Sequence, residues 1–268
     1  MFPAETKLKG TFYEVQSAAT ALQVYLDSQK TLYDRVKNQQ IAQLLQTIVT
    51  DRQHVLEVGC GGGTWTQHFV RRGASVAVVE KERHLVEATR LHLERHNLPL
   101  SQVTFQCSDL LDTPLSPLFD FVFAKDVLEH VEDDKHFVER LSSVLVPGGL
   151  LLLSTQNSLS LNYVIEGFYQ RYLRGRREWM GWDPTHVRFY NYFSLKKLLL
   201  AHQLQPLEWV GTYHIPYRLF KIFGPRALSC VETRMGKWFH APEQLAGHRF
   251  PVNLLGWNIV VVAKKISL

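Results

Sequence analysis

The chain has 268 residues, of which 46% are hydrophobic and 21% charged, and its formal net charge is +5. This is an ordinary globular composition, and it excludes a disordered, collagenous or fibrous protein. A chain of this length can bury a core without disulfides, as one domain or as one domain with a cap.

Cysteine content and apolar runs bear on the compartment. Cys60, Cys107 and Cys230 are spaced too widely for a CxxC pair or a zinc-finger ligand set, and their odd number indicates a reducing compartment. The first residues, MFPAETKLKG, lack the apolar stretch of a signal peptide, and every apolar run is far shorter than the ~20 residues of a membrane span. We therefore expect a cytoplasmic protein without stable membrane insertion.

The first two thirds of the chain are predicted to alternate between strands and helices. Apolar residues recur at helical spacing over 11–50, and a polar turn at 51–53 follows. The alternation that begins there indicates a mostly parallel sheet covered on both faces. The predicted strands are 54–58, 75–80, 103–107, 119–124 and 150–155, and the predicted helices are 65–72, 83–95 and 133–144.

The last third is less regular. It contains a predicted helix at 194–202 and predicted strands at 206–213 and 254–264. Two long aromatic-rich segments, 157–190 and the irregular 214–250, are expected to be ordered caps over a ligand site. The arginine cluster that begins at Arg171 is either an exposed helix end or a patch for an anionic acceptor, such as a carboxylate, a phosphate or a lipid head group. We expect an N-terminal helical lid over 1–50 and a domain over 51–268.

The sharpest motif is HVLEVGCGGGTW, in which a strand leads into a glycine-rich turn and a helix. Glycine lets the backbone approach a bulky ligand, and the new helix offers free N–H groups. A dinucleotide fingerprint, GxGxxG or GxGxxA, needs glycine or alanine at Thr64 when counted from Gly59 and Gly61. When the motif is counted from Gly61 and Gly63, the third position is again a threonine, Thr66. The nicotinamide interpretation therefore fails on spacing.

The spacing that does fit is acid-x-Gly-x-Gly-x-Gly, and with it the segment 55–155 resembles the class I S-adenosylmethionine (SAM) dependent methyltransferases. Glu80 ends the second strand, Asp109 follows the third, and a Pro-Gly-Gly turn at 147–149 precedes the fifth. The resemblance implies an α/β fold, with a doubly wound, mostly parallel sheet of seven strands. It also implies SAM as the cofactor and S-adenosylhomocysteine as its product.

The same resemblance assigns the cofactor site. Glu80 would bind the ribose hydroxyls through charge-assisted hydrogen bonds, and Asp109 with the Leu110 N–H would bind the adenine. The alternative for these acids is a strand-end cap on the next helix. The residues assigned to the cofactor are Glu57, Gly59, Cys60, Gly61, Gly63, Glu80, Lys81, Asp109, Leu110, Lys125 and Asp126.

After the fourth strand, the string KDVLEHV is similar to the signature of the ubiquinone-biosynthesis O-methyltransferases. In those enzymes an acid-x-x-acid-His set is associated with a divalent metal, and here that set would be Asp126, Glu129 and His130. The alternative is a helix-start acid with a packed histidine, and we expect no metal. His130 and His186, which lies in DPTHV, are the candidate catalytic residues, because an imidazole can remove a proton from the acceptor. For His186 the alternative is a loop histidine bonded to backbone.

Two further groups of residues are predicted near the cofactor and the acceptor. Tyr25, Tyr33, Arg35 and Lys37 lie on the N-terminal helices, where a cation could meet the methionine carboxylate; exposed charges on an amphipathic helix are the alternative. Aromatic residues of the two caps would form apolar walls for a ring-bearing or lipid-like acceptor, or else the core of a small cap. They are Tyr163, Phe168, Tyr169, Trp179, Trp182, Tyr213, Tyr217, Phe220 and Trp238.

The sequence thus favours an enzyme that methylates a small molecule, most simply at oxygen. N- or C-methylation and a SAM-binding protein without transferase activity are the alternatives. A nucleic-acid methyltransferase is disfavoured, because no NPPY or DPPY motif follows the fourth strand and no long basic stripe is present. Nothing in the sequence bears on the oligomeric state.

Overall fold

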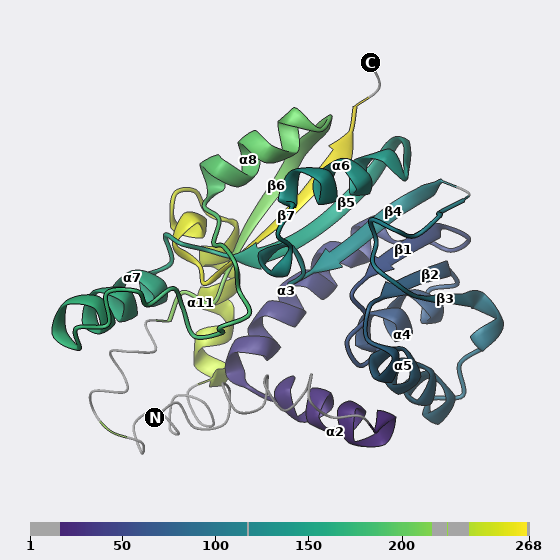
Figure 1. Ribbon diagram of the computed structural model, residues 1–268, viewed down its shortest axis with the longest axis horizontal. Coiled ribbons are helices and arrows are strands. Elements are labelled where there is room, and N and C mark those ends of the chain that lie inside the picture. Colours follow the sequence, from purple (N-terminus) through teal and green to yellow (C-terminus); the bar gives the residue numbers. More distant parts are fainter. Residues whose placement is uncertain (1–16, 117, 216–223, 225–235, 267–268) are drawn as a thin grey trace.

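The structure is a computed structural model that describes residues 17–116, 118–215, 224 and 236–266, with the side chains of 236–240 left aside. Its centre is a seven-stranded sheet in the order β3-β2-β1-β4-β5-β7-β6, in which β7 runs antiparallel to its neighbours β5 and β6 (Figure 1). The predicted α/β fold with a mostly parallel sheet is confirmed. The strands are β1 His54–Val58, β2 Ser75–Glu80, β3 Val103–Cys107, β4 Phe119–Lys125, β5 Leu145–Gln156, β6 Leu204–Thr212 and β7 Asn258–Lys265.

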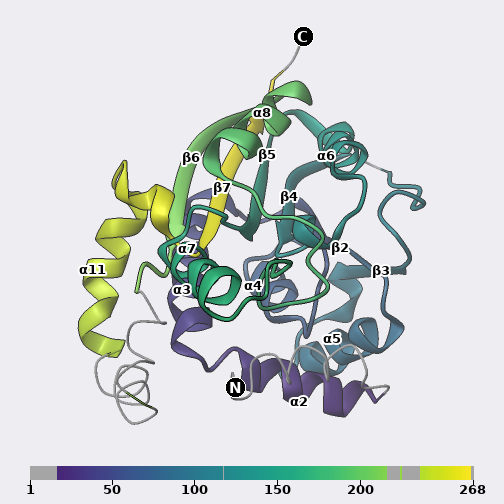
Figure 2. The ribbon, with the colours of Figure 1, turned by 60° about the vertical axis from the view of Figure 1, so that its left-hand side comes forward.

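Helices cover both faces of the sheet (Figures 1 and 2). One apolar cluster joins the sheet to α6 and α8, and a second joins it to α3, α4 and α5. Because both faces are covered, central strands such as Phe121–Ala124 are fully buried and read as continuous apolar runs. The helices are α2 Ala18–Ser28, α3 Leu32–Ile48, α4 Thr64–Arg71, α5 Arg83–Arg95, α6 Asp134–Ser143, α7 Leu161–Phe168, α8 Tyr192–Ala201 and α11 Gly236–His248.

The strand order reverses between β1 and β4. The chain moves outward from β1 to β2 and β3, then returns to place β4 on the other side of β1. Connections from the carboxyl ends of β1 and β4 therefore diverge and leave a crevice, which is where open α/β sheets bind their ligands. The glycine loop and the segment after β4 both lie there.

The N-terminal segment is two helices rather than one continuous helical stretch. After Ser28 the chain turns, and Thr31 begins α3 by accepting a hydrogen bond from the Asp34 N–H at 3.0 Å. Such a threonine cap satisfies a free N–H of the new helix, so the break has a local cause. The predicted helical residues 11–16 lie outside the described part of the chain.

The irregular segment predicted over 214–250 contains α11, which holds Pro242 in its interior. Prolines usually end helices, and this misled the sequence interpretation. Packing compensates here: Gln40 of α3 donates from Nε2 to the Glu243 carbonyl at 3.1 Å, and Glu243 accepts from the His214 N–H at 2.8 Å. The last strand also starts later than predicted, because Val252–Leu255 forms the short 3-10 helix η5.

One other boundary differs from the prediction. The Pro-Gly-Gly turn at 147–149 lies inside β5 at a shift in its pairing with β4, instead of preceding the strand. In the described part of the chain, no helix is long and apolar enough to cross a membrane.

Candidate functional site

A cavity of about 790 Å³ lies at the carboxyl ends of β1, β2 and β4. Its walls come from the glycine loop, from the ends of β2 and β3, from the segment after β4, and from α2 and α3. The segment 182–186 closes it on the acceptor side. Of the predicted cofactor residues, it is lined by Gly59, Cys60, Gly61, Glu80, Lys81, Asp109, Leu110, Lys125 and Asp126.

The glycine loop is packed tightly on the inner side of this cavity. Gly59 and Gly61 have φ of +77° and +54°, a region that L-residues rarely adopt. A Cβ added at Gly61 or Gly62 would overlap the ring of Tyr25 from α2, and one added at Gly59 would overlap Val127. Glycine is thus required both by the turn and by the close approach of α2.

Two acids present carboxylates to the cavity from neighbouring strands. Glu80 is 9% exposed at the end of β2, accepts the Glu82 N–H at 3.0 Å, and has a pKa that burial raises. Asp109 follows β3, accepts the Leu111 N–H at 2.9 Å, and pairs with Lys81 Nζ at 2.5 Å. Burial acts to raise the pKa of Asp109, but Lys81 and this N–H bring it below the usual value. The carboxylates of Glu80 and Asp109 are hydrogen-bond acceptors on neighbouring strand ends, and they suit a vicinal diol and an amino group, respectively.

Two of the predicted cofactor residues do not line the cavity. Glu57 is fully buried, and its Oε2 accepts the Thr66 hydroxyl at 2.5 Å behind the glycine loop. Gly63 has φ +81° and begins α4, where its lack of a Cβ accommodates Thr89. The cofactor contacts predicted for them are therefore not found: in the structure both residues support the glycine loop and do not line the cavity.

The buried Glu57 predicts a pH-dependent stability. Burial raises its pKa from the ordinary 4.5 to about 8. Between these values the native state keeps a proton that the unfolded chain releases, so the free energy of unfolding falls as pH rises, by up to about 1.4 kcal/mol per pH unit. Glu57→Gln should remove this component in urea unfolding at pH 6, 7 and 8. Glu87→Gln, at an exposed site, should keep it. An unchanged slope in Glu57→Gln would contradict the assignment.

A buried ionic cluster occupies the end of β4. Lys37 Nζ and Lys125 Nζ lie 2.6 Å and 2.9 Å from Oδ2 of Asp126, and Ser154 donates to its Oδ1 at 2.8 Å. Burial acts to raise the pKa of Asp126, but the two lysines hold it well below its usual value. Burial also lowers the pKa of Lys125. Asp34 Oδ1 also lies 3.7 Å from Lys37 Nζ, so two lysines and two carboxylates meet here, and the ammonium groups can donate to an anionic ligand group.

This cluster bears on two alternatives that the sequence left open. The Lys37 side chain is 3% exposed, so it is not a solvated charge on an amphipathic helix. Asp126, held by the lysines, does not join Glu129 and His130 as a ligand set. The groups that could hold a metal among the described residues are instead Glu129, His130 and His186, whose ligand atoms lie within 4.8 Å of one another.

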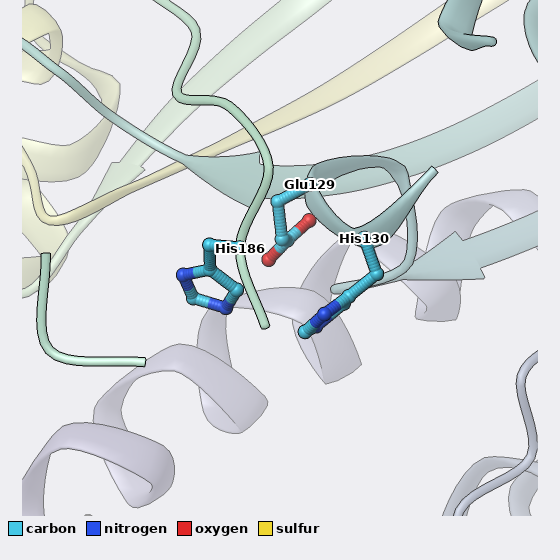
Figure 3. Close-up of side chains that lie close together, drawn as sticks. All are labelled: Glu129, His130 and His186. Carbon is cyan, nitrogen blue, oxygen red and sulfur yellow. The ribbon is translucent and has the colours of Figure 1, made fainter. Parts of the chain in front are cut away.

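Figure 3 shows these three side chains converging from two segments. Glu129 and His130 lie on the 3-10 helix η2, Leu128–His130, and His186 lies on the facing loop. The imidazole rings of His130 and His186 are 4.7 Å apart, and His186 Nε2 is 3.8 Å from Oδ2 of Asp183. Both candidate catalytic histidines therefore line the cavity beside one another.

A hydrogen-bonded chain orients His130. Asp183 Oδ1 accepts the Thr185 hydroxyl at 2.6 Å, and that hydroxyl oxygen lies 3.1 Å from His130 Nδ1. Since the threonine proton is directed to the carboxylate, its oxygen accepts from Nδ1–H, and neutral His130 carries its lone pair on Nε2. A base oriented in this way can accept a proton from a bound hydroxyl.

The aromatic walls are mostly different from those predicted. Of the described residues in the predicted set, Trp182 lines the cavity, whereas Tyr163 and Trp179 pack with Phe189 inside the cap and Tyr213 is in a buried cluster. Tyr217, Phe220 and the Trp238 side chain lie outside the described residues. Sequence reasoning missed Trp257, which stacks on Trp182 with ring centroids 4.5 Å apart and lines the cavity. It precedes β7 in a segment without a motif.

The residues present fit SAM. The acids of β2 and β3 suit the ribose and adenine, the Lys37–Asp126–Lys125 cluster suits a carboxylate, and the tight glycine loop leaves its backbone against the cavity. The two histidines line the same cavity, together with residues 182–185. This arrangement combines an anchoring site with a compartment where an acceptor can be deprotonated.

Comparison with known proteins agrees with this interpretation. Residues 32–208 match the family model described as "Methyltransferase domain". The chain is 32% identical over 168 residues to a ubiquinone biosynthesis O-methyltransferase of Bradyrhizobium sp. (strain ORS 278), and the match covers 61% of this chain and 62% of that protein. The match thus spans less than two thirds of the relative's length.

Solved structures share the fold at low sequence identity. An N-methyltransferase, NodS from Bradyrhizobium japonicum WM9 in complex with S-adenosylhomocysteine, aligns with a TM-score of 0.54 and 14% identity, and 88% of each chain is covered. The [4+2]-cyclase SpnF aligns with a TM-score of 0.58 and 18% identity, over 85% of this chain and 80% of that one. A fold shared with a cyclase leaves the reaction to be argued from the site.

Proposed function

Because this chain belongs to the methyltransferase domain family, we propose that it transfers a methyl group from SAM to an oxygen of a small, apolar acceptor. The observation that carries the proposal is that one cavity is lined both by the acids that follow from β2 and β3, Glu80 and Asp109, and by His130 with His186. When bound, SAM supplies an activated methyl group on sulfur. Nitrogen or carbon as the methylated atom, and SAM binding without transfer, are the alternatives.

The chain's own residues have three tasks in this proposal. Glu80 and Asp109 hold the nucleoside, and Lys37 with Lys125 attracts the carboxylate of the amino-acid part. Trp182 and Trp257 form an apolar surface for the acceptor, and His130 takes the proton from its hydroxyl. Since the methyl donor is already activated, much of the rate enhancement comes from holding the two reactants in line.

We further propose that α2 and α3 act as a lid over the cofactor and that the protein works in the cytoplasm on a small molecule, without nucleic acid. Residues of both helices line the cavity, which supports the lid. Cys60 and Cys107 are free thiols, as expected in a reducing compartment.

The test uses SAM with a trideuterated methyl group, the purified protein, and a metabolite and lipid extract of the source organism. High-resolution mass spectrometry should detect a species that gains a labelled methyl group, and fragmentation should place the label on oxygen. No labelled product, with SAM binding confirmed by calorimetry, would favour a SAM-binding protein without transferase activity.

Asp109→Ala is expected to weaken SAM binding at least tenfold without changing the fold. It removes a charged acceptor, and hydrogen bonds to charged groups contribute about 1.5–3 kcal/mol. Calorimetry measures the affinity, and circular dichroism checks the fold. Asp112→Ala, an exposed acid three residues on, is the matched control and should bind normally. An unchanged affinity of Asp109→Ala for SAM would show that Asp109 does not bind the cofactor.

Methyl transfer is expected to survive EDTA. His130 is already oriented by Thr185, and His186 lies beside Asp183, so both imidazoles are placed for proton transfer without an ion. The labelled-methyl assay should give equal rates with and without chelator. Complete loss that added Mg²⁺, Mn²⁺ or Zn²⁺ restores would instead establish Glu129, His130 and His186 as a metal site.

A further inference from the structure

The two candidate catalytic histidines come from segments that the fold has to hold together. His130 lies on η2, in the connection from β4 to α6, whereas His186 lies much later in the chain, in the loop before α8 (Figure 3). Their ring centroids are nevertheless 4.7 Å apart. Because a loop has no regular hydrogen bonding of its own to fix its position, contacts between the two segments must set this distance.

A backbone hydrogen bond joins the two segments next to the histidines. The Val187 N–H donates to the Glu129 carbonyl at 2.9 Å. One hydrogen bond contributes only modestly to the folded state, because its groups exchange water partners for each other. It also allows the loop to pivot about the bond. Contacts at other points are therefore needed to hold the ring of His186 in one orientation.

Arg188 supplies such contacts through both arms of its guanidinium group. Nη1 lies 2.6 Å from Oδ1 of Asp134, and Nη2 donates to the Glu132 carbonyl. Both partners belong to the segment that carries His130, since Glu132 follows that histidine closely and Asp134 is the first residue of α6. A planar guanidinium that binds two acceptors at once fixes direction as well as distance.

The other carboxylate oxygen of Asp134 is held by Tyr190. The tyrosine hydroxyl donates to Oδ2 at 2.8 Å, and its ring is buried in the apolar cluster that joins α6 and α8 to the sheet. The backbone of Tyr190 is tied to the end of β5, because its N–H donates to the Gln156 carbonyl at 3.1 Å. Asp134, Arg188 and Tyr190, which we call the clamp, thus connect the loop, the start of α6 and the sheet.

We propose that Arg188, through the clamp, is a positioning residue that holds the imidazole of His186 beside that of His130 for methyl transfer. The inference rests on the proposed function, which places both rings in one acceptor compartment. The described residues that line the cavity include neither Arg188 nor its clamp partners, so Arg188 acts through the histidines. Loss of Arg188 should therefore slow methyl transfer and leave SAM binding unchanged.

A nuclear Overhauser measurement tests this geometry without the reaction. Rings at 4.7 Å should give a cross-peak between the ring protons of His130 and His186, assigned with His130→Gln and His186→Gln in deuterated protein with protonated histidine. We expect the cross-peak to be lost in Arg188→Ala, with circular dichroism showing that the variant is folded. Arg83→Ala, at an exposed site where the arginine lies 3.8 Å from Glu87, is the matched control and should keep it. An unchanged cross-peak in Arg188→Ala would overturn the proposal.

Kinetics with the acceptor from the labelled-methyl experiment give the second readout. Arg188→Ala should lower kcat about tenfold, with KM for SAM and its calorimetric affinity within about twofold of the unaltered values. Because the Arg188 side chain is 33% exposed, added ethylguanidinium can reach its place and should restore part of the rate. Ethylammonium, which lacks the planar fork, should not.

A further variant and the order of the readouts keep the test decisive. Arg188→Lys keeps the charge but cannot bind both acceptors, so its kcat should fall between those of Arg188→Ala and the unaltered protein. A kcat of Arg188→Ala within about twofold of the unaltered value, or a fall that only follows a loss of SAM affinity, would overturn the proposal. If the unaltered protein transfers no methyl group, the proposed function fails, and the cross-peak alone decides for or against the clamp.

Discussion

His130→Gln is expected to lower kcat for methyl transfer at least a hundredfold while leaving the affinity for SAM unchanged. His130 lines the cavity, and the contact of its Nδ1 with Thr185, whose hydroxyl donates to Asp183, leaves the lone pair of the neutral ring on Nε2. General base catalysis contributes typically about 10²–10⁴-fold, and glutamine keeps the size of the side chain without its basicity. The rate is measured with the acceptor identified by the labelled-methyl experiment.

Two companion variants sharpen this result. Thr185→Val removes the hydrogen bond that orients His130, so kcat should fall about tenfold and the acidic limb of its pH profile, where a general base becomes protonated, should shift, while SAM binding stays normal. His136→Gln, at an exposed site on α6, is the matched control and should keep full activity. A fall of less than threefold in His130→Gln would mean that positioning alone accounts for the rate.

Asp126→Asn is expected to lower the free energy of unfolding by about 3 kcal/mol, because it leaves Lys37 and Lys125 close together without the carboxylate that they share. Asparagine is the informative substitution, since residue 126 has φ +55° and asparagine tolerates this conformation better than alanine. Urea unfolding at pH 7 measures the change.

A double-mutant cycle isolates the ion pair. Lys37→Met removes one of the two cations that faced Asp126, so the double variant Lys37→Met/Asp126→Asn should lose clearly less stability than the sum of the two single variants. Strict additivity would show that the 2.6 Å contact between Lys37 and Asp126 contributes little in solution. Asp112→Asn, at an exposed site, should leave stability within about 0.5 kcal/mol.

The predicted helices and strands were confirmed where the sequence pattern was local and repeated. Helix α5 has the predicted bounds, Arg83–Arg95, because its apolar residues recur at helical spacing between two polar segments. Glu80 and Asp109 line one cavity as expected, since parallel strands bring their carboxyl ends to the same edge. The prediction of an irregular segment was wrong for 236–248, where α11 tolerates Pro242 through contacts with α3 that no local pattern reveals.

The sequence by itself determined the sheet, the glycine turn and the acids that follow it, because each depends on residues within one strand-turn-helix unit. Tertiary structure decided which groups meet: Asp126 with Lys37 across 89 residues, and the His130 ring with that of His186. It also turned Glu57 away from the cavity and left Phe168 and Tyr172 exposed. Ionic partners, shared protons and exposed faces depend on distances between remote segments, and those distances exist only once the chain is packed.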